Sequence, residues 1–189
     1  MAADPLRRVF DILRSKSSIG WSGSARGGPD RPLPRSVWTE EDFERIEWHD
    51  SKIHGYMNQL DEGRLLFDLD YHVKWVHPQP SEVFMRTSIS PATLVFHSVR
   101  AIAGDADLDL PDEFQGIDRG VECPRALWES VQPTPPDWFL DGIGFSMAIW
   151  CDGFTQYLRR APVLRTNCFL RIAERGGVCF DEVGYTQYA

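Results

Sequence analysis

The sequence predicts an α+β fold that is mostly antiparallel β-sheet, of a meander or sandwich-like kind, with one or two short N-terminal helices. Apolar and polar residues alternate almost strictly from 67 to 76, as in a strand with one buried face. Short apolar runs separated by turn-forming residues follow this segment. With 189 residues, of which 42% are hydrophobic, the chain can bury the core of one domain.

The N-terminal part differs from the rest in spacing and charge. Four apolar residues recur at helical spacing: Leu6, Val9, Phe10 and Leu13. They predict a helix over 4–16, which is too short to be stable alone and must dock on another surface. Residues 17–36 are rich in Gly, Ser, Pro and Arg and predict a flexible linker. We therefore expect a basic N-terminal helix and linker over 1–36, followed by a single acidic β-rich domain over 37–189.

A second short helix is predicted where the domain begins. Thr39 is a suitable N-cap residue, and the three residues after it are acidic, as favoured in a first helical turn. Phe43 and Ile46 would then face the core over about two turns.

The alternation over 67–76 assigns each side chain to one face of a strand. Phe67, Leu69, Tyr71, Val73 and Trp75 are expected to face the core, and Asp68, Asp70, His72 and Lys74 to face away from it. Further strands are predicted over 48–57, 83–89, 92–99, 105–110, 138–150, 154–160 and 168–173. Residues 116–136, which are rich in turn formers and prolines, are expected to form a long irregular crossing.

The register of the predicted 48–76 hairpin can be chosen from its charges. Pairing Asn58 with Arg64 sets the apolar residues of both strands on one face, with Gly55 opposite Phe67. On the other face it places three polar pairs opposite one another: His54 and Asp68, Lys52 and Asp70, and Asp50 and His72. Opposite charges in such cross-strand pairs are stabilising, whereas a shift of two residues would oppose two aspartates.

This polar face is the one constellation that could carry chemistry. Carboxylates beside imidazoles bind divalent cations or tune a general base. The candidate catalytic residues are His54, Asp68, Asp70 and His72, with Asp50 beside them. The competing interpretation is a solvent-exposed sheet face whose opposite charges simply pair, and we favour it because cross-strand pairing explains the composition. Lys52 in the middle argues against a metal, so we expect no metal and no cofactor.

Charge is distributed unevenly along the chain. Residues 1–36 hold seven Lys/Arg against three Asp/Glu, a net +4, whereas residues 37–189 hold thirteen against twenty-five, a net −12. The acidic domain argues against a nucleic-acid partner, since phosphate contacts need a basic surface. It suits a basic protein partner instead, because complementary charge speeds association.

One segment of the domain is basic. Residues 155–175 carry five arginines and one glutamate, which could receive an acidic partner or balance the acidic domain internally. Internal pairing is the favoured interpretation. The candidate binding residues are Asp50, Lys52, Asp70, Arg159 and Arg160.

Several function classes lack their motifs. No stretch approaches the roughly 18 apolar residues that cross a bilayer, and charges throughout 1–16 argue against a signal peptide. The four cysteines lie far apart without a C-x-x-C pair, which argues for reduced thiols and a cytoplasmic protein. The acidic run 105–109 begins like a calcium loop but lacks its glycine and bidentate acid. Ser146 lacks the second glycine of a nucleophile elbow, and no phosphate-binding loop is present.

Several strings of residues occur in an order that resembles a group of uncharacterised bacterial proteins. They are Trp-His-Asp at 48–50, Ile-His-Gly at 53–55, Leu-Asp-Tyr at 69–71, Lys-Trp at 74–75, Ser-Pro-Ala-Thr-Leu-Val-Phe at 90–96, Gly-Phe-Thr-Gln at 153–156, Leu-Arg at 158–159 and Ala-Pro at 161–162. The resemblance covers roughly residues 47–165 and brings no established activity. Small single-domain proteins of this sort are sometimes immunity partners of bacterial toxins, so it implies a toxin-neutralising role.

We therefore expect a non-enzymatic protein-binding domain that acts through its acidic surface. Two alternatives remain open. One is a small metal- or acid–base-dependent enzyme that uses the polar face of the hairpin, and the other is a structural homodimer that associates through a sheet edge.

Overall fold

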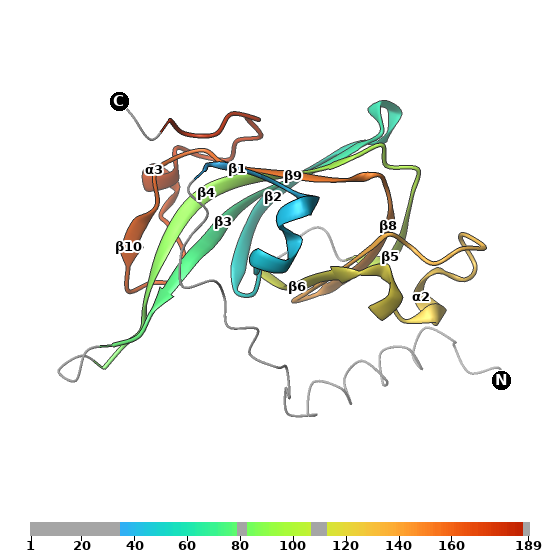
Figure 1. Ribbon diagram of the computed structural model, residues 1–189, viewed down its shortest axis with the longest axis horizontal. Helices are drawn as coiled ribbons and strands as arrows, with labels where there is room; N and C mark the ends of the chain where they lie inside the picture. Colours follow the sequence, from blue (N-terminus) through green and yellow to red (C-terminus); the bar gives the residue numbers. More distant parts are fainter. Residues whose placement is uncertain (1–34, 79–82, 107–112, 187–189) are drawn as a thin grey trace.

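In the computed structural model, which describes residues 35–78, 83–106 and 113–186, ten antiparallel strands form one open sheet (Figure 1). The predicted fold class is therefore confirmed. The strands are β1 (Val37–Thr39), β2 (Ser51–Gln59), β3 (Arg64–Val76), β4 (Arg86–His97), β5 (Ala101–Ala106), β6 (Glu113–Arg119), β7 (Trp138–Gly142), β8 (Phe145–Trp150), β9 (Gly153–Leu158) and β10 (Val163–Arg165). The short helices are η1 (Glu40–Arg45), η2 (Leu60–Glu62), η3 (Gly120–Glu122), α2 (Arg125–Trp128) and α3 (Ile172–Arg175).

The sheet has the strand order β1-β9-β4-β3-β2-β6-β7-β8-β5, and β10 pairs with β4 beside β9. The β4–β9 pair continues into the β5–β8 pair, and two backbone hydrogen bonds hold the connecting segments together. The amide of Asp152 donates to the carbonyl of His97 at 3.0 Å, and that of Arg100 donates to the carbonyl of Trp150 at 2.8 Å. Figure 1 shows that strands β5–β8 form a group turned relative to the strands around β4.

The main core joins these two groups of strands. The rings of Phe67 on β3 and Phe114 on β6 lie 5.4 Å apart, and Trp138 on β7 lies 5.1 Å from Phe154 on β9. The predicted inward face of β3 is confirmed for Phe67, Leu69 and Tyr71, all of which are buried. Inward-facing aromatic rings from both groups therefore supply much of the apolar burial.

Helix η1 confirms the helix start predicted at residue 39. The carboxylate of Asp42 accepts a hydrogen bond from the amide of Thr39 at 3.0 Å, which satisfies a donor at the helix N-terminus. The same carboxylate pairs with Arg35. Phe43 and Ile46 are buried as expected, and the ring of Phe43 lies 5.0 Å from that of Trp138.

A smaller apolar cluster covers the other face of β5, β7 and β8. It contains Ala103, Phe139, Ala148 and Trp150, and helix α2 packs on it through Leu127 and Trp128. No helix in the described part of the chain is long and apolar enough to cross a membrane.

Strand β4 corrects the prediction of two strands over 83–89 and 92–99. Pro91 lies inside this single strand, where its missing N–H would ordinarily break a ladder. Its carbonyl accepts a hydrogen bond from the amide of Arg159 at 2.9 Å, so its ring nitrogen points toward the junction between β9 and β10 rather than toward β3. The ladder is already interrupted there, which is why a proline is tolerated.

Other predicted boundaries were also wrong. The predicted strand over 138–150 is two strands, β7 and β8, separated by a turn at Ile143 and Gly144. Strand β6 occupies the start of the predicted irregular crossing, and 168–173 is not a strand but a loop leading into α3. The predicted helix over 4–16, the linker up to residue 34 and most of the acidic strand over 105–110 lie outside the described residues.

Candidate functional site

The β2–β3 hairpin contains a bulge that changes the predicted register. Lys52 pairs with Asp70 and Ile53 with Leu69, as predicted. The register then shifts at His54, so Asp68 lies opposite Gly55 and not opposite His54. For the same reason Arg64 pairs with Gln59 rather than with Asn58. The extra residue of a bulge has no cross-strand partner, which leaves His54 to find another contact.

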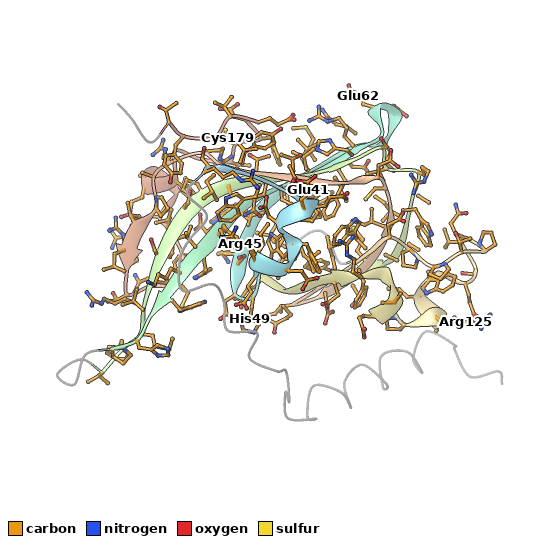
Figure 2. The ribbon with its side chains drawn as sticks, viewed as in Figure 1. Glu41, Arg45, His49, Glu62, Arg125 and Cys179 are labelled. Atoms are coloured by element: carbon orange, nitrogen blue, oxygen red, sulfur yellow. The ribbon has the colours of Figure 1, made fainter. Side chains whose placement is uncertain are left out.

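The polar face of this hairpin is buried, which corrects the expectation of a solvent-exposed face. Asp68 and Asp70 have no exposed surface, and His72 is 4% exposed. The C-terminal segment, residues 166–186, supplies the groups that cover them. Its amides at Leu170 and Cys179 and the side chain of Arg175 all bond to the two aspartates. Figure 2 draws the side chains on the ribbon and labels Cys179, which belongs to this segment.

Asp68 is surrounded by donors. The guanidinium of Arg175 donates to its two oxygens at 2.6 and 2.7 Å, in a bidentate arrangement. Arg159 donates to Oδ1, and the amide of Cys179 donates to Oδ2 at 3.0 Å. Both oxygens of Asp68 are thus occupied by groups of the protein.

Asp70 is held in a similar way by three groups. Its Oδ2 lies 3.0 Å from Nε2 of His54 and accepts the amide of Leu170 at 2.7 Å, while Oδ1 accepts Nε of Arg175 at 3.1 Å. Burial alone would raise the pKa of Asp70. The hydrogen bonds from His54 and Leu170 and the nearby positive charges outweigh it and hold that pKa below its ordinary value.

Two arginines balance the two buried carboxylates. Arg175 also donates to the carbonyl of Gly177 at 2.8 Å, and Arg159 donates to Oγ1 of Thr93 and to the carbonyl of Cys179. Two negative and two positive side chains therefore meet beneath the C-terminal segment. This is the internal pairing that the sequence favoured for the basic 155–175 segment.

His72 lies on the same face but makes different contacts. Its Nδ1 is 2.9 Å from Oγ1 of Thr87, and its ring stacks on Trp75 with centroids 4.7 Å apart. Trp75 was predicted to face the core. A bulge between His72 and Lys74 inverts the faces of β3 beyond that point and sets Trp75 beside His72.

The other ring nitrogen of His72 is buried, with no hydrogen-bond partner among the described residues. Burial holds the pKa of His72 below its ordinary value, although the carboxylate and carbonyl of Asp50 and the carbonyl of Cys168 favour the protonated form. Burial thus favours the neutral form of His72. The pKa of the neighbouring Cys168 thiol is raised by partial desolvation and by the nearby carboxylates of Asp50 and Glu113, which disfavours a reactive thiolate.

The remaining candidate binding residues lie toward the surface. Asp50 is partly exposed and lies 2.9 Å from Nδ1 of His49, and Lys52 is half-buried opposite Asp70 and Glu113. Arg160 is exposed and donates to the carbonyl of Glu174 at 2.8 Å. Asp70 and Arg159, in contrast, belong to the buried cluster. Asp50, Lys52 and Arg160 thus do not join Asp70 and Arg159 in one accessible surface.

The buried cluster offers little for acid–base or metal chemistry. Every oxygen of Asp68 and Asp70 accepts a hydrogen bond from the protein, so neither carboxylate has a free position for a substrate proton. No group of three His, Cys, Asp or Glu side chains within the described ranges could hold a metal ion. The cluster instead fastens the C-terminal segment to the sheet.

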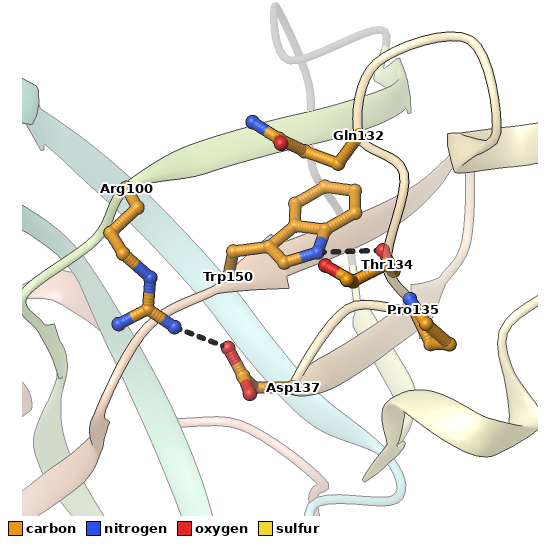
Figure 3. Close-up of a pocket in the computed structure, with 6 residues that line it drawn as sticks. All are labelled: Arg100, Gln132, Thr134, Pro135, Asp137 and Trp150. Atoms are coloured by element: carbon orange, nitrogen blue, oxygen red, sulfur yellow. Dashed lines mark hydrogen bonds and ion pairs between the residues drawn. The ribbon is translucent and has the colours of Figure 1, made fainter.

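A shallow depression of about 380 Å³ lies at the other end of the sheet, beside Trp150. Figure 3 shows Arg100 reaching toward Asp137 next to this indole. Arg100 pairs with Asp137 at 2.8 Å and with Asp152 at 2.5 Å, while the indole N–H of Trp150 donates to the carbonyl of Thr134 at 3.0 Å. Its charged and polar groups already contact one another, so it offers few anchors for a ligand.

An exposed apolar surface, which we call the β10 patch, lies on strand β10 and the loop and helix that follow. Its members and their exposed fractions are Val163 (37%), Leu164 (46%), Phe169 (52%) and Ile172 (57%). Figure 1 shows β10 beside α3, and an ion pair of 3.0 Å between Arg165 and Glu174 joins the two elements. The sequence pattern does not predict this patch, because residues 168–173 were expected to form a strand.

Compared with known proteins, the chain matches no family model, no curated protein and no solved structure. The resemblance to a group of bacterial proteins, and the toxin-neutralising role that it implies, therefore stay predictions.

Proposed function

We propose that the chain is a non-enzymatic protein-binding domain that contacts its partner through the β10 patch. The carrying observation is the exposure of Val163, Leu164, Phe169 and Ile172, 37–57% each, on adjoining elements. Exposed apolar side chains gathered on adjoining elements favour an interaction surface. Phe169, an aromatic residue at the surface, is the expected anchor.

The enzyme alternative is disfavoured by the state of its candidate residues. Acid–base or metal chemistry would need His54, Asp68, Asp70 and His72 to be reachable by a substrate. The C-terminal segment instead covers the two aspartates, and its donors occupy both carboxylates. A general base must reach a substrate proton, and Asp68 and Asp70 have no exposed surface through which to reach one.

The charge around the β10 patch suggests the chemistry of the partner. Arg160, Arg165 and Arg171 against Glu174 give this surface a net charge of +2. A contact surface with apolar groups and acidic side chains would complement it. The overall acidity of the domain had favoured a basic partner. A toxin-neutralising role for this chain, in which its acidic surface binds such a partner away from the β10 patch, stays a prediction. We further propose the cytoplasm as its compartment, which the four free cysteines support.

The test compares the full chain with a variant that carries Phe169→Asp and Ile172→Asp. Proteins captured from a bacterial lysate by each form are quantified by mass spectrometry, and the binary Kd is then measured for each protein that binds the unmodified chain. Truncating an interface anchor costs about 2 kcal/mol, so we expect a Kd about 30-fold weaker for the double variant.

Val121→Asp is the matched control, because Val121 is 81% exposed and lies outside the patch. It should bind like the unmodified chain, and circular dichroism should show the same fold for all three. Equal affinity of the double variant for every partner would overturn the proposal. Sedimentation of the purified chain tests the homodimer alternative. A dimer of the unmodified chain that dissociates in the double variant would show that the patch binds a second copy and not the proposed partner.

A further inference from the structure

A second hollow lies beside the point at which the described chain begins. It has a volume of about 480 Å³, and its lining includes Ala161, Asp181, Val183 and Tyr185. The hollow lies where the chain leaves β9 and the C-terminal segment returns, since the amide of Tyr185 donates to the carbonyl of Leu158 at 2.8 Å. Val183 is 69% exposed there.

The N-terminal part of the sequence starts from this same place. The hydroxyl of Ser36 donates to the carbonyl of Tyr185 at 2.7 Å, and the carbonyl of Ser36 accepts the amide of Leu158 at 2.7 Å. Arg35 is fixed by its ion pair with Asp42. The 34 residues before Arg35 are therefore tethered at the edge of the hollow.

These 34 residues contain a stripe that needs an apolar surface. Leu6, Val9, Phe10 and Leu13 would form one face of a helix over 4–16. Residues 4–16 also hold four Lys/Arg against two Asp, a net +2. A helix of 13 residues is marginal in water, so docking of its apolar face is what would stabilise it.

Charge distinguishes the β10 patch from the hollow as a docking site for this stripe. The β10 patch carries a net +2 and would repel a basic helix. The hollow is lined by Asp181, and its one lining arginine, Arg159, is neutralised by Asp68. Of these two, the hollow is thus the surface with complementary charge.

The connecting residues are long enough to allow this docking. Residues 17–34, rich in Gly, Ser and Pro, would span about 60 Å when fully extended and about 24 Å on average as a random coil. A helix over 4–16 is about 20 Å long. A tether of this length gives an effective concentration on the order of millimolar. That favours docking on the same chain over docking on a second copy.

We propose that residues 4–16 form a helix whose apolar stripe docks in the hollow beside Val183 and Tyr185 of the same chain. This inference is independent of the proposed function, because it uses a different surface. Docking would cover the hollow and leave the β10 patch free.

Hydrogen–deuterium exchange of the full chain tests the proposal. We expect amides of residues 6–16 to exchange at least tenfold more slowly in the unmodified chain than in Phe10→Asp, which places a charge on the stripe. Val183→Asp should accelerate the same amides by a similar factor, since it changes the other side of the contact. Conversely, Phe10→Asp should raise exchange within 181–186.

Two controls add a charge away from the contact. Ser15→Asp lies off the apolar stripe, and Val121→Asp lies away from the hollow. Both should leave exchange in 6–16 unchanged, and slow exchange in β3 and β4 should confirm that each variant is folded. If Val183→Asp speeds exchange in β3 and β4, Val183→Ser is used in its place.

Three results would overturn the proposal. One is exchange of residues 6–16 at the rate of an unstructured chain in the unmodified protein. Another is slow exchange of residues 6–16 that persists in both Val183→Asp and Val183→Ser. The last is exchange of residues 6–16 that becomes slower as the protein concentration rises, which would assign the contact to a second copy.

Discussion

Asp68 and Arg175 lie 107 positions apart in the sequence, yet they form a bidentate ion pair between two side chains with no exposed surface. A buried charge without a partner is costly, whereas a buried pair with further hydrogen bonds is tolerated. Here the further donors are Arg159 and the amide of Cys179. The pair therefore fixes where the C-terminal segment lies on the sheet.

Breaking this pair should destabilise the domain strongly. We expect Asp68→Asn to lower the free energy of unfolding by about 3–5 kcal/mol, because it leaves a buried arginine partly unpaired. Urea unfolding followed by fluorescence measures this. Glu129→Gln, at the exposed Arg125–Glu129 pair, should change it by less than about 1 kcal/mol. The double variant Asp68→Asn with Arg175→Met should lose less free energy of unfolding than the sum of the losses in the two single variants. Strict additivity of these losses would show that the two side chains are not coupled.

Asp70 should make the domain sensitive to acid. Its pKa in the folded state is lowered, so its stabilising contribution is fully present above the unfolded pKa, which is about 3.9. That contribution is lost as the pH falls further, through the lower folded pKa. Chemical unfolding between pH 2.5 and 6 should show a steeper loss of stability for the unmodified chain than for Asp70→Asn. Parallel pH profiles for the two would contradict this.

His72 should add a second pH dependence at higher pH. Its folded pKa is also lowered, by burial, so its contribution is complete above the unfolded pKa of about 6.5 and is lost as the pH falls below that value. We expect the difference in urea midpoint between pH 7.5 and 5.5 to shrink in His72→Asn. A difference in His72→Asn equal to that of the unmodified chain would contradict this prediction. A smaller dependence should persist from His97, whose pKa is lowered in the same direction.

Gly120 should tolerate no side chain. A Cβ atom at this position would lie 1.7 Å from the carbonyl oxygen of Pro136, which is a backbone atom and cannot move aside cheaply. Gly120→Ala is expected to lower the free energy of unfolding by about 1–3 kcal/mol or more, as overpacking usually does, and to lower Tm in a thermal melt. At Gly116, in strand β6, a Cβ would meet its nearest atom, Oδ2 of Asp118, at 3.5 Å. Gly116→Ala should therefore melt well above Gly120→Ala.

The sequence pattern predicts local features of this fold well. Alternation over 67–76 places Phe67, Leu69 and Tyr71 in the core, because a strand with one buried face repeats every two residues. The helix start at Thr39 follows from acidic residues whose side chains satisfy N-terminal amides.

The same pattern fails where one extra residue enters a strand. The bulge at His54 moves its imidazole to Asp70, and the bulge after His72 turns Trp75 to the outer face. A bulge leaves composition and alternation almost unchanged, so the sequence gives no sign of it.

Burial of the candidate site could not be predicted from the strands that carry it. Alternation of Asp68 and Asp70 with apolar residues is the usual mark of a solvated face. What covers them comes from Leu170, Arg175 and Cys179, about 100 positions later. The usable signal was the run of arginines over 155–175, which supplies the two cations that the buried aspartates need.

Coverage of the sheet by the C-terminal segment has a consequence for the order of events during synthesis. Strands β3 and β4 leave the ribosome long before Arg175 and Cys179 do. Until then, Asp68 and Asp70 lack the donors that they have in the finished fold. The outer face of the sheet stays hydrated until the segment that carries Leu170, Arg175 and Cys179 has been made, because these residues supply its donors. Closure of this face therefore follows the synthesis of Arg175 and Cys179, well after β3 and β4 themselves.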